Sequence, residues 1–167
     1  MNNKKKIRVL FICMGNICRS PTAEAVFLHY VEKEGLSEFI QIDSAGTHDY
    51  HIGDAPDIRT QRAAKNRGYD MTRLRGRQVD AGDFFKFDYV LAMDEANLSI
   101  LRRLRPDDAD SHLGLFLEFA GRHIEREVPD PYYGGADGFE RVLDMVEDAA
   151  SGLIQHIRTV HIDVHEE

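Results

Sequence analysis

The sequence contains no tryptophan and only two cysteines, Cys13 and Cys18, among its 167 residues. Two cysteines five positions apart match neither a zinc-ligand spacing nor the disulfide framework of a small secreted domain. None of the eight histidines is placed in a metal-ligand pattern. We therefore predict a cytoplasmic protein that uses no metal and no cofactor.

The sequence also lacks an excess of positive charge and any long apolar run. It has 29 acidic and 21 basic side chains, and the formal net charge of −8 is the wrong sign for a general binder of nucleic acids or anionic membranes. No stretch is long enough and apolar enough to span a bilayer or to act as a signal peptide. We expect neither nucleic acid nor membrane as a partner, so any anion binding must be local.

The length is typical of one domain that buries a core without disulfides or metal. Residues 1–167 are therefore predicted to form a single domain, and the charged ends, residues 1–6 and 161–167, are predicted to be loose tails. We find no repeat, linker or low-complexity segment.

Hydrophobic spacing predicts strands and helices in alternation. Residues 112–119 fit either a strand or a helix, and a strand to about residue 117 is favoured. The predicted strands are residues 7–12, 39–42, 89–93 and 112–117, with turns at 43–47 and 84–85, and the predicted helices are residues 21–34, 57–68, 95–105 and 137 onward. This order predicts a three-layer αβα domain with a four-stranded parallel sheet, flavodoxin- or Rossmann-like.

The first strand leads into a loop that ends at Ser20-Pro21, an N-cap followed by the proline that is typical of a first helical turn. Gly15 and Asn16 in this loop tolerate a left-handed backbone. Because ligands of such sheets bind beyond the carboxyl ends of the strands, and a helix N-terminus attracts anions, we expect a phosphate-binding loop here.

Cys13 and Arg19 stand at the two ends of this loop. A helix N-terminus and a nearby guanidinium both favour the thiolate form of a cysteine, which is the nucleophilic form. The planar guanidinium of Arg19 can hold two phosphate oxygens. The loop therefore predicts a nucleophile aimed at a bound phosphate group.

Four segments of the sequence resemble, in order and spacing, the low-molecular-weight protein tyrosine phosphatases. They are Cys13-Met14-Gly15-Asn16-Ile17-Cys18-Arg19-Ser20-Pro21, Asp43-Ser44-Ala45-Gly46-Thr47, Phe87-Asp88-Tyr89-Val90-Leu91-Ala92-Met93-Asp94 and Pro129-Asp130-Pro131-Tyr132-Tyr133-Gly134. The resemblance implies a phosphotyrosine phosphatase with a cysteinyl-phosphate intermediate on Cys13, phosphate bound by Arg19, and Asp130 as general acid and then base. It also implies phosphotyrosine proteins as partners and inorganic phosphate as product and inhibitor.

The resemblance extends to residues around the phosphate. Asn16, Ser20 and Ser44 are expected to hold the loop in shape, with Ser20 also serving as helix N-cap and as hydrogen-bond donor to the Cys13 sulfur. The expected substrate-binding residues are Met14, Gly15, Asn16, Ile17, Cys18, Ser20, Tyr50, Tyr132 and Tyr133, the three tyrosines forming a wall for an aromatic leaving group.

Four further points are left open. Cys18 could form a reversible disulfide with Cys13 under oxidation, or it could be a passive loop residue. Leu74 stands where the family usually has a histidine that hydrogen-bonds the loop asparagine, so the support of Asn16 is uncertain from sequence. Phosphorylation of Tyr132 and Tyr133, which occurs in the family, is not required by the residues, and no oligomeric state is assigned.

Three alternatives share the anion site. Ile17 at the loop apex resembles tyrosine-directed members, whereas phosphoarginine phosphatases typically have a smaller threonine there. An arsenate reductase of the same fold would need further cysteines after Cys18, and the chain has none. A non-catalytic phosphoprotein-binding module would need neither Cys13 nor Asp130.

Overall fold

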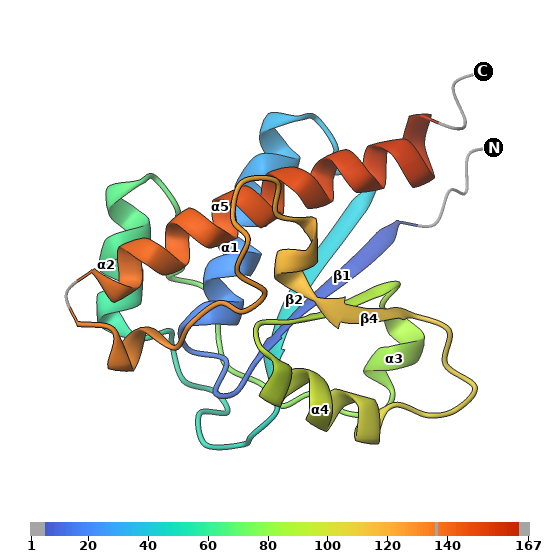
Figure 1. The fold of residues 1–167 in the computed structure, drawn as a ribbon, viewed down its shortest axis with the longest axis horizontal. Helices are drawn as coiled ribbons and strands as arrows, with labels where there is room; N and C mark the ends of the chain where they lie inside the picture. The colour runs from blue at the N-terminus through green and yellow to red at the C-terminus, as the bar shows by residue number, and fades with distance from the viewer. Residues whose placement is uncertain (1–5, 136, 164–167) are drawn as a thin grey trace.

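Four parallel strands form one sheet in the order β2-β1-β3-β4 in the computed structural model, which describes residues 6–135 and 137–163 (Figure 1). The strands are β1 (Ile7–Cys13), β2 (Ile40–Gly46), β3 (Tyr89–Ala92) and β4 (His112–Leu115). The predicted α/β fold with a four-stranded parallel sheet is confirmed. Because the chain crosses from β2 past β1 to β3, a crevice opens beyond the carboxyl ends of β1 and β3.

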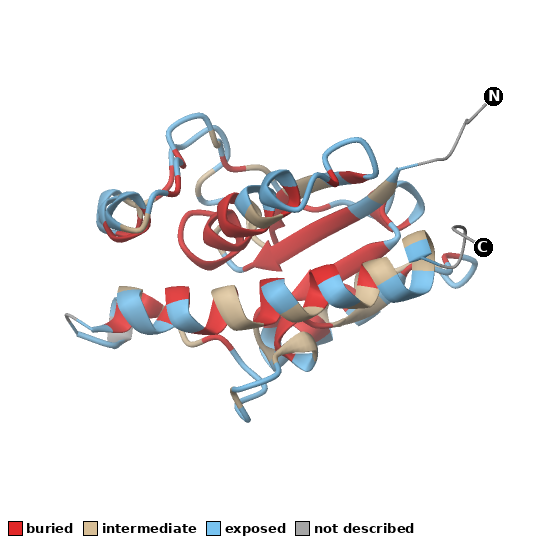
Figure 2. Ribbon diagram, turned by 90° about the horizontal axis from the view of Figure 1, so that it is seen from above, coloured by how far each residue is buried: buried red, intermediate tan, exposed pale blue. Residues whose placement is uncertain are grey.

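Helices cover both faces of the sheet, and Figure 2 shows the buried strands between two helical layers. Helices α1 and α5 lie on one face, with α2 packed against α5, and helices α3 and α4 lie on the other. The helices are α1 (Arg19–Lys33), α2 (Ile58–Asn66), α3 (Asp83–Lys86), α4 (Glu95–Leu104) and α5 (Gly138–Ile157), with 3₁₀ turns η1 (Phe116–Phe119) and η2 (Pro131–Tyr133) and a π-helical turn η3 (Arg158–Ile162).

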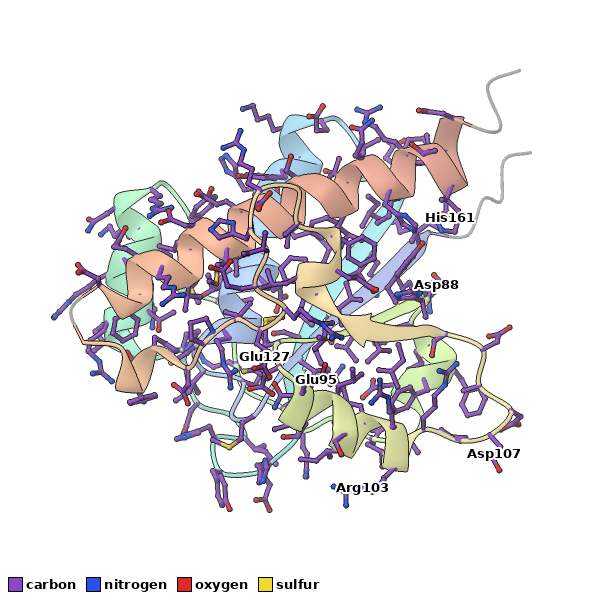
Figure 3. All side chains as sticks on the ribbon, in the orientation of Figure 1. Asp88, Glu95, Arg103, Asp107, Glu127 and His161 are labelled. Atoms are coloured by element: carbon purple, nitrogen blue, oxygen red, sulfur yellow. The ribbon has the colours of Figure 1, made fainter. Side chains whose placement is uncertain are left out.

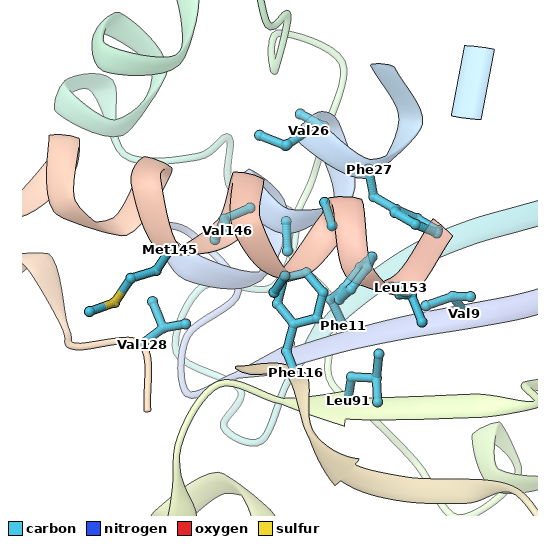
Figure 4. Close-up of a cluster of buried hydrophobic side chains, with 14 of the residues drawn as sticks. Val9, Phe11, Val26, Phe27, Leu91, Phe116, Val128, Met145, Val146 and Leu153 are labelled. Atoms are coloured by element: carbon cyan, nitrogen blue, oxygen red, sulfur yellow. The ribbon is translucent and has the colours of Figure 1, made fainter. Parts of the chain in front are cut away.

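Strand β1 is buried on both faces because its apolar side chains alternate between two hydrophobic clusters. Phe11 points to the α1 and α5 side, where its ring meets Phe27 and Phe116 edge to face at 5.6 and 4.9 Å (Figure 4). Leu10 and Ile12 point to the α3 and α4 side. Fully burying one such side chain stabilises a fold by roughly 1.5 to 3 kcal/mol. The strand that ends at Cys13 is therefore held firmly.

Strand β2 is longer than the sequence predicted. Residues 43–46, expected as a turn, continue the strand and pair in parallel with Leu10–Cys13 of β1. The polar residues Asp43 and Ser44 obscure this strand in the sequence because β2 lies at the edge of the sheet. The extension places Ser44 next to the loop that follows β1.

Two smaller predictions are corrected. The expected turn at Phe84-Phe85 is the short helix α3, in which Phe84 is buried and Phe85 exposed. Strand β4 ends at Leu115, and the chain then turns through η1, so residues 112–119 contain both a strand and a helical turn.

The predicted loose tail from residue 161 is wrong for His161 and Ile162. They belong to η3, which directly continues α5. His156 of α5 and His161 of η3 share one partner, with their Nε2 atoms 3.0 and 2.8 Å from the Tyr89 hydroxyl. His161 lies beyond the C-terminal end of α5 (Figure 3). Residues 1–5 and 164–167 of the predicted tails lie outside the described residues.

Candidate active site

The loop between β1 and α1 is shaped by Asn16, whose φ of 58° is left-handed. The Asn16 side-chain amide donates hydrogen bonds to Ser20 Oγ at 2.8 Å and to Ser44 Oγ at 2.9 Å. Its Oδ1 accepts the backbone N–H of Arg77 at 3.0 Å. Asn16 thus ties together the loop, α1, β2 and the segment before α3, which supports its predicted structural role.

The hydrogen bond from Arg77 N also shows how Asn16 is supported although Leu74 replaces the histidine that the family usually has. The side chain of Leu74 packs against the hydrophobic cluster on the α1 and α5 face, and a backbone N–H three residues later satisfies the loop asparagine. A backbone donor does not depend on the side chain at its position. Asn16 is therefore fully supported without a histidine.

Gly46 allows the end of β2 to lie directly against the loop. A Cβ atom built on Gly46 would lie 2.8 Å from the carbonyl oxygen of Met14. The two residues after Gly46 are hydrogen-bonded to the same loop: Thr47 N donates to Cys13 O at 2.9 Å, and His48 N donates to Met14 O at 3.0 Å. A larger residue at position 46 would displace the loop.

The thiol of Cys13 lies at the start of this loop and is nearly covered, with 3% of the residue exposed. Its Sγ is 3.0 Å from Ser20 Oγ and accepts the backbone N–H of Asn16 at 3.3 Å. Donors placed in this way stabilise a thiolate. The predicted contact between Ser20 and the Cys13 sulfur is present in the structure.

Ser20 is not the N-cap of α1. It is the second residue of the helix, the N-cap is Cys18, and Cys18 makes no side-chain capping bond. Thr22 Oγ1 instead donates to Cys18 O at 2.6 Å. The helix begins earlier than the Ser20-Pro21 signal suggests because its first turn is part of the phosphate-binding loop.

Arg19 is buried behind the loop, with 5% of the residue exposed. Its NH1 donates to Asp94 Oδ2 at 2.6 Å and to Val128 O at 3.1 Å. Burial opposes the charge of Arg19, but Cys13 and Asp94 outweigh it and raise the pKa of the guanidinium. Asp94 is also the N-cap of α4, since its Oδ1 accepts Asn97 N at 2.8 Å.

A cleft of about 80 Å³ opens above the Cys13 loop. It brings together residues from three distant segments: the loop itself, the segment after β2 and the segment around η2. Its lining residues are Cys13, Met14, Gly15, Ile17, Cys18, Arg19, Tyr50, His51, Asp130 and Tyr132. Asn16, Ser20 and Ser44, in contrast, act from behind the loop, and the Tyr133 side chain lies outside the described part of the structure.

Residues 8–162 match the sequence model of a family described as low molecular weight phosphotyrosine protein phosphatase. The chain belongs to this family. A relative with that name from Schizosaccharomyces pombe is 44% identical over 154 residues, which cover 92% of this chain and 98% of the relative. A low molecular weight protein-tyrosine-phosphatase from Streptomyces coelicolor is also 44% identical, covering 90% and 93%.

The likeness to solved structures agrees. The crystal structure of a protein tyrosine phosphatase from Entamoeba histolytica matches this phosphatase with a TM-score of 0.88 at 41% identity, covering 92% of this chain and 98% of that one. The predicted family, and with it the assignment of the chain to a family of phosphatases, is confirmed.

His51 is a residue of the phosphatase cleft that sequence reasoning missed. Its Nδ1 lies 3.1 Å from Asp54 Oδ2, and its ring packs against Gly15, where a Cβ would lie 3.2 Å from His51 Cδ2. No motif marks this histidine. The nearest signal in the sequence was its place beside Tyr50, which was expected to bind the substrate.

Cys18 shares the cleft wall but differs from Cys13 in its environment. Burial raises the pKa of the Cys18 thiol to about 12, with the neighbouring acidic residues Asp57 and Asp130 adding to the effect and Thr60 opposing it. Both cysteines are free thiols. Cys18 is therefore protonated at neutral pH and is not a nucleophile in this state.

Chemistry rather than volume identifies the active site of this phosphatase. A larger hollow of about 630 Å³ lies between α1, α5 and residues 122–123, but its acids already have partners, such as Glu147 with Arg67 and Asp148 with His123. Within residues 6–135 and 137–163, no three His, Cys, Asp or Glu side chains are arranged to hold a metal ion. No helix in the described ranges is long and apolar enough to cross a membrane.

Proposed function

We propose that this phosphatase hydrolyses phosphotyrosine in proteins, and small aryl phosphates, with Cys13 as nucleophile, Arg19 as phosphate ligand and Asp130 as general acid and base. The observation that carries the proposal is the convergence of these three side chains on one cleft, although Asp130 is far from the loop in sequence. A thiol, a guanidinium and a carboxyl at one anion site are the groups that a two-step phosphoryl transfer needs.

In the first step, the Cys13 thiolate attacks phosphorus and the bond from phosphorus to the phenolic oxygen breaks. The protonated Asp130 gives its proton to that oxygen, so the leaving group departs as a neutral phenol. The phosphoryl group is then held as a cysteinyl phosphate. The hydrogen bonds to Cys13 from Asn16 N and Ser20 keep the sulfur ready for this attack.

Arg19 stabilises the charge on the phosphoryl oxygens during this transfer. Asp94 and Val128 occupy only its NH1 group. Within the described residues the Nε and NH2 groups have no hydrogen-bond partner, so they can form two parallel bonds to phosphate. The N–H groups of the loop at the N-terminus of α1 add to this electrostatic stabilisation.

In the second step, the Asp130 carboxylate removes a proton from a water molecule as the water oxygen attacks phosphorus. The sulfur–phosphorus bond breaks, inorganic phosphate forms, and the Cys13 thiolate and protonated Asp130 are restored. Phosphate is thus both the product and a competitive ligand of the same site.

The walls of the cleft support a phosphotyrosine substrate. Tyr50 and Tyr132 are 71% and 47% exposed and line the entrance, where their rings can stack on an aromatic leaving group. Ile17 adds apolar surface at the loop apex, as in tyrosine-directed members of the family. Comparing turnover of phosphotyrosine with that of phosphoarginine tests this preference directly.

We also infer a cytoplasmic location and phosphotyrosine proteins as partners. The free thiols of Cys13 and Cys18 support the location, since a reducing compartment keeps a nucleophilic cysteine active.

Release of nitrophenol from para-nitrophenyl phosphate tests the function. Cys13→Ser should abolish turnover while inorganic phosphate still binds, and Asp130→Ala should lower kcat/KM by about 10²-fold or more. The remote exposed acid Asp107 (Figure 3) provides a control, since Asp107→Ala should match the wild type. Full activity of Cys13→Ser would overturn the proposal, and binding of a phosphotyrosine peptide without turnover by the wild type would favour a binding module.

A further inference from the structure

The segment that carries Asp130 is anchored on its N-terminal side. Val128 N donates to Met93 O at 2.8 Å, and Val128 O accepts Arg19 NH1 at 3.1 Å. One residue earlier, Glu127 Oε2 accepts the backbone N–H of Glu95 at 2.8 Å, and Figure 3 labels both residues. The chain is thus fixed to the residue that follows β3, to α4 and to the Arg19 side chain just before it reaches Asp130.

A second anchor lies on the C-terminal side, two residues after Asp130. The Tyr132 hydroxyl donates to Asp57 Oδ2 at 2.9 Å. The guanidinium carbon of Arg59 lies 4.7 Å from the centre of the Tyr132 ring and 5.1 Å from that of Phe139. Tyr132 N also donates to Asp130 Oδ1 at 3.0 Å, so a shift of Tyr132 would move the Asp130 carboxyl group with it.

Asp57 connects this anchor to the phosphate-binding loop. Its backbone N–H donates to Ile17 O, at the apex of the loop, at 2.9 Å. Its Oδ1 accepts Arg59 N at 2.8 Å and Thr60 N at 3.3 Å, which caps α2. One residue therefore touches the loop that holds the phosphate and the segment that supplies the proton.

The charge state of Asp57 suits this role. Burial opposes ionisation, since only 11% of the side chain is exposed, but hydrogen bonds from Arg59 and Tyr132 outweigh it and hold the pKa of Asp57 below its ordinary value. Asp57 is therefore a carboxylate at neutral pH. Hydrogen bonds to a carboxylate are shorter and stronger than neutral ones.

We propose that Asp57 is a positioning residue for the general acid: it holds the Tyr132 hydroxyl and thereby fixes Asp130 at the height of the leaving-group oxygen above the phosphate-binding loop. The inference rests on the proposed function, since it assigns Asp130 the role of proton donor. A misplacement of about 1 Å at a catalytic group can cost on the order of 100-fold in rate.

If Asp57 served only as the cap of α2, its replacement would affect the reaction rates in a different way. Loss of a cap costs about 1 kcal/mol of stability and would lower the rates for all substrates by the same factor. Loss of general-acid positioning affects substrates unequally, because a poor leaving group needs the proton more than a good one. The ratio of kcat/KM for phenyl phosphate to that for para-nitrophenyl phosphate separates the two roles.

The test uses Asp57→Ser, which retains a capping hydroxyl but is too short to reach Tyr132, and Tyr132→Phe, which keeps the ring and removes the hydroxyl. Each should lower kcat/KM for phenyl phosphate by about tenfold and that for para-nitrophenyl phosphate by about twofold or less. The double variant should be no worse than either single one, because both remove the same contact. Asp70→Ser, which alters another local hydrogen bond to a backbone N–H, at Thr72 N, is the control and should leave the ratio unchanged.

The outcomes separate this inference from the proposed function. If Asp130→Ala lowers the ratio of kcat/KM values but Asp57→Ser and Tyr132→Phe do not, Asp57 is only a helix cap and the positioning role is wrong. Additive losses in the double variant would also overturn it. If Asp130→Ala itself leaves both rates unchanged, the proposed function fails instead.

Discussion

Arg19 and Asp94 form an ion pair of 2.6 Å between NH1 and Oδ2 at the back of the candidate active site. The pair spans the crevice, because Arg19 opens α1 after strand β1 and Asp94 opens α4 after strand β3. Because NH1 is held in this way, the remaining edge of the guanidinium is available for phosphate in the proposed mechanism, and Asp94 has the role of orienting Arg19 there.

Replacing Asp94 should therefore weaken phosphate binding. In Asp94→Asn, one oxygen remains to cap α4 while the acceptor for Arg19 is lost, and we expect the competitive Ki of phosphate to rise about tenfold, as for loss of a charged hydrogen bond. Asp94→Ala should show the same rise in Ki but an additional loss of about 1 kcal/mol in unfolding free energy, because it also removes the cap. An unchanged Ki in both variants would show that Asp94 is only a cap.

The two cysteines should differ in reactivity. Iodoacetamide at pH 7 is expected to label Cys13 once per chain and to leave Cys18 unlabelled, because burial raises the pKa of the Cys18 thiol to about 12 and the thiol form does not react. Inorganic phosphate should protect Cys13 by occupying the same site. Mass mapping of the labelled peptides, with Cys13→Ser as control, checks this, and native labelling at Cys18 would contradict it.

The parts of the structure that the sequence predicts well are those fixed by local chemistry. The apolar run of β1, the left-handed Asn16 and the Ser20-Pro21 pair are neighbours in the chain, so the strand, the loop and a helix close behind them are visible in one short stretch, although α1 begins two residues before Pro21. The glycine that ends α1 is equally local: Gly35 has a φ of 70°, and Leu36 N donates to Val31 O, as in a Schellman motif.

The parts that were missed depend on partners far away in sequence. Asp43 and Ser44 belong to β2 because they pair with β1. The low strand propensity of these polar residues does not predict this pairing. The position of Asp94 before α4 is explained by helix capping alone, so nothing in the sequence indicates its second contact, with Arg19. Asp130 was predicted as a site residue only because the segment from Pro129 to Gly134 resembles the family. The chain around it contains only the short η2 turn, so no helix or strand pattern predicts its position in the cleft.

Protonation of Asp148 should lower the unfolding free energy of the protein at acid pH. Its carboxylate accepts the backbone N–H groups of Gly121, Arg122 and His123 at 3.0, 2.9 and 2.8 Å, together with His123 Nδ1 at 2.8 Å. Burial opposes ionisation, but these bonds outweigh it and lower the pKa of Asp148 to about 2. Because the folded pKa is below the unfolded one, this stabilisation is present above about pH 4 and is lost as the pH falls toward 2.

Asp148→Asn should therefore lower the unfolding free energy by about 2 kcal/mol at pH 7. The difference from the wild type should stay constant between pH 7 and pH 5 and narrow below pH 4, as measured by urea unfolding. Asp107→Asn, at an exposed site, is the control and should follow the wild type throughout. A difference that does not narrow in acid would mean that the lost stability comes from packing rather than from charge.

Glu24 should contribute the opposite pH dependence, because its carboxyl is partly buried on α1 beside Ser44, one of the residues that hold the phosphate-binding loop in shape. Burial and the neighbouring Asp43 raise the pKa of Glu24 to about 7, although Arg77 and the hydrogen bond from Ser44 Oγ, at 2.6 Å, oppose this. The folded state thus binds the proton more tightly than the unfolded state, whose pKa is near 4.5. The contribution of Glu24 to the unfolding free energy should be largest below about pH 4.5 and should fall as the pH rises to about 7.

Glu24→Gln removes this dependence, because the neutral amide resembles the protonated acid and its oxygen still accepts Ser44. The variant should match the wild type near pH 4.5 and exceed it by about 2 to 3 kcal/mol near pH 8 in urea unfolding. Glu32→Gln, an exposed site on the same helix, is the matched control and should show no such divergence. Parallel curves for Glu24→Gln and the wild type would show that Glu24 is ionised in the folded protein across this range, and that Ser44 is held by a charged rather than a neutral acceptor.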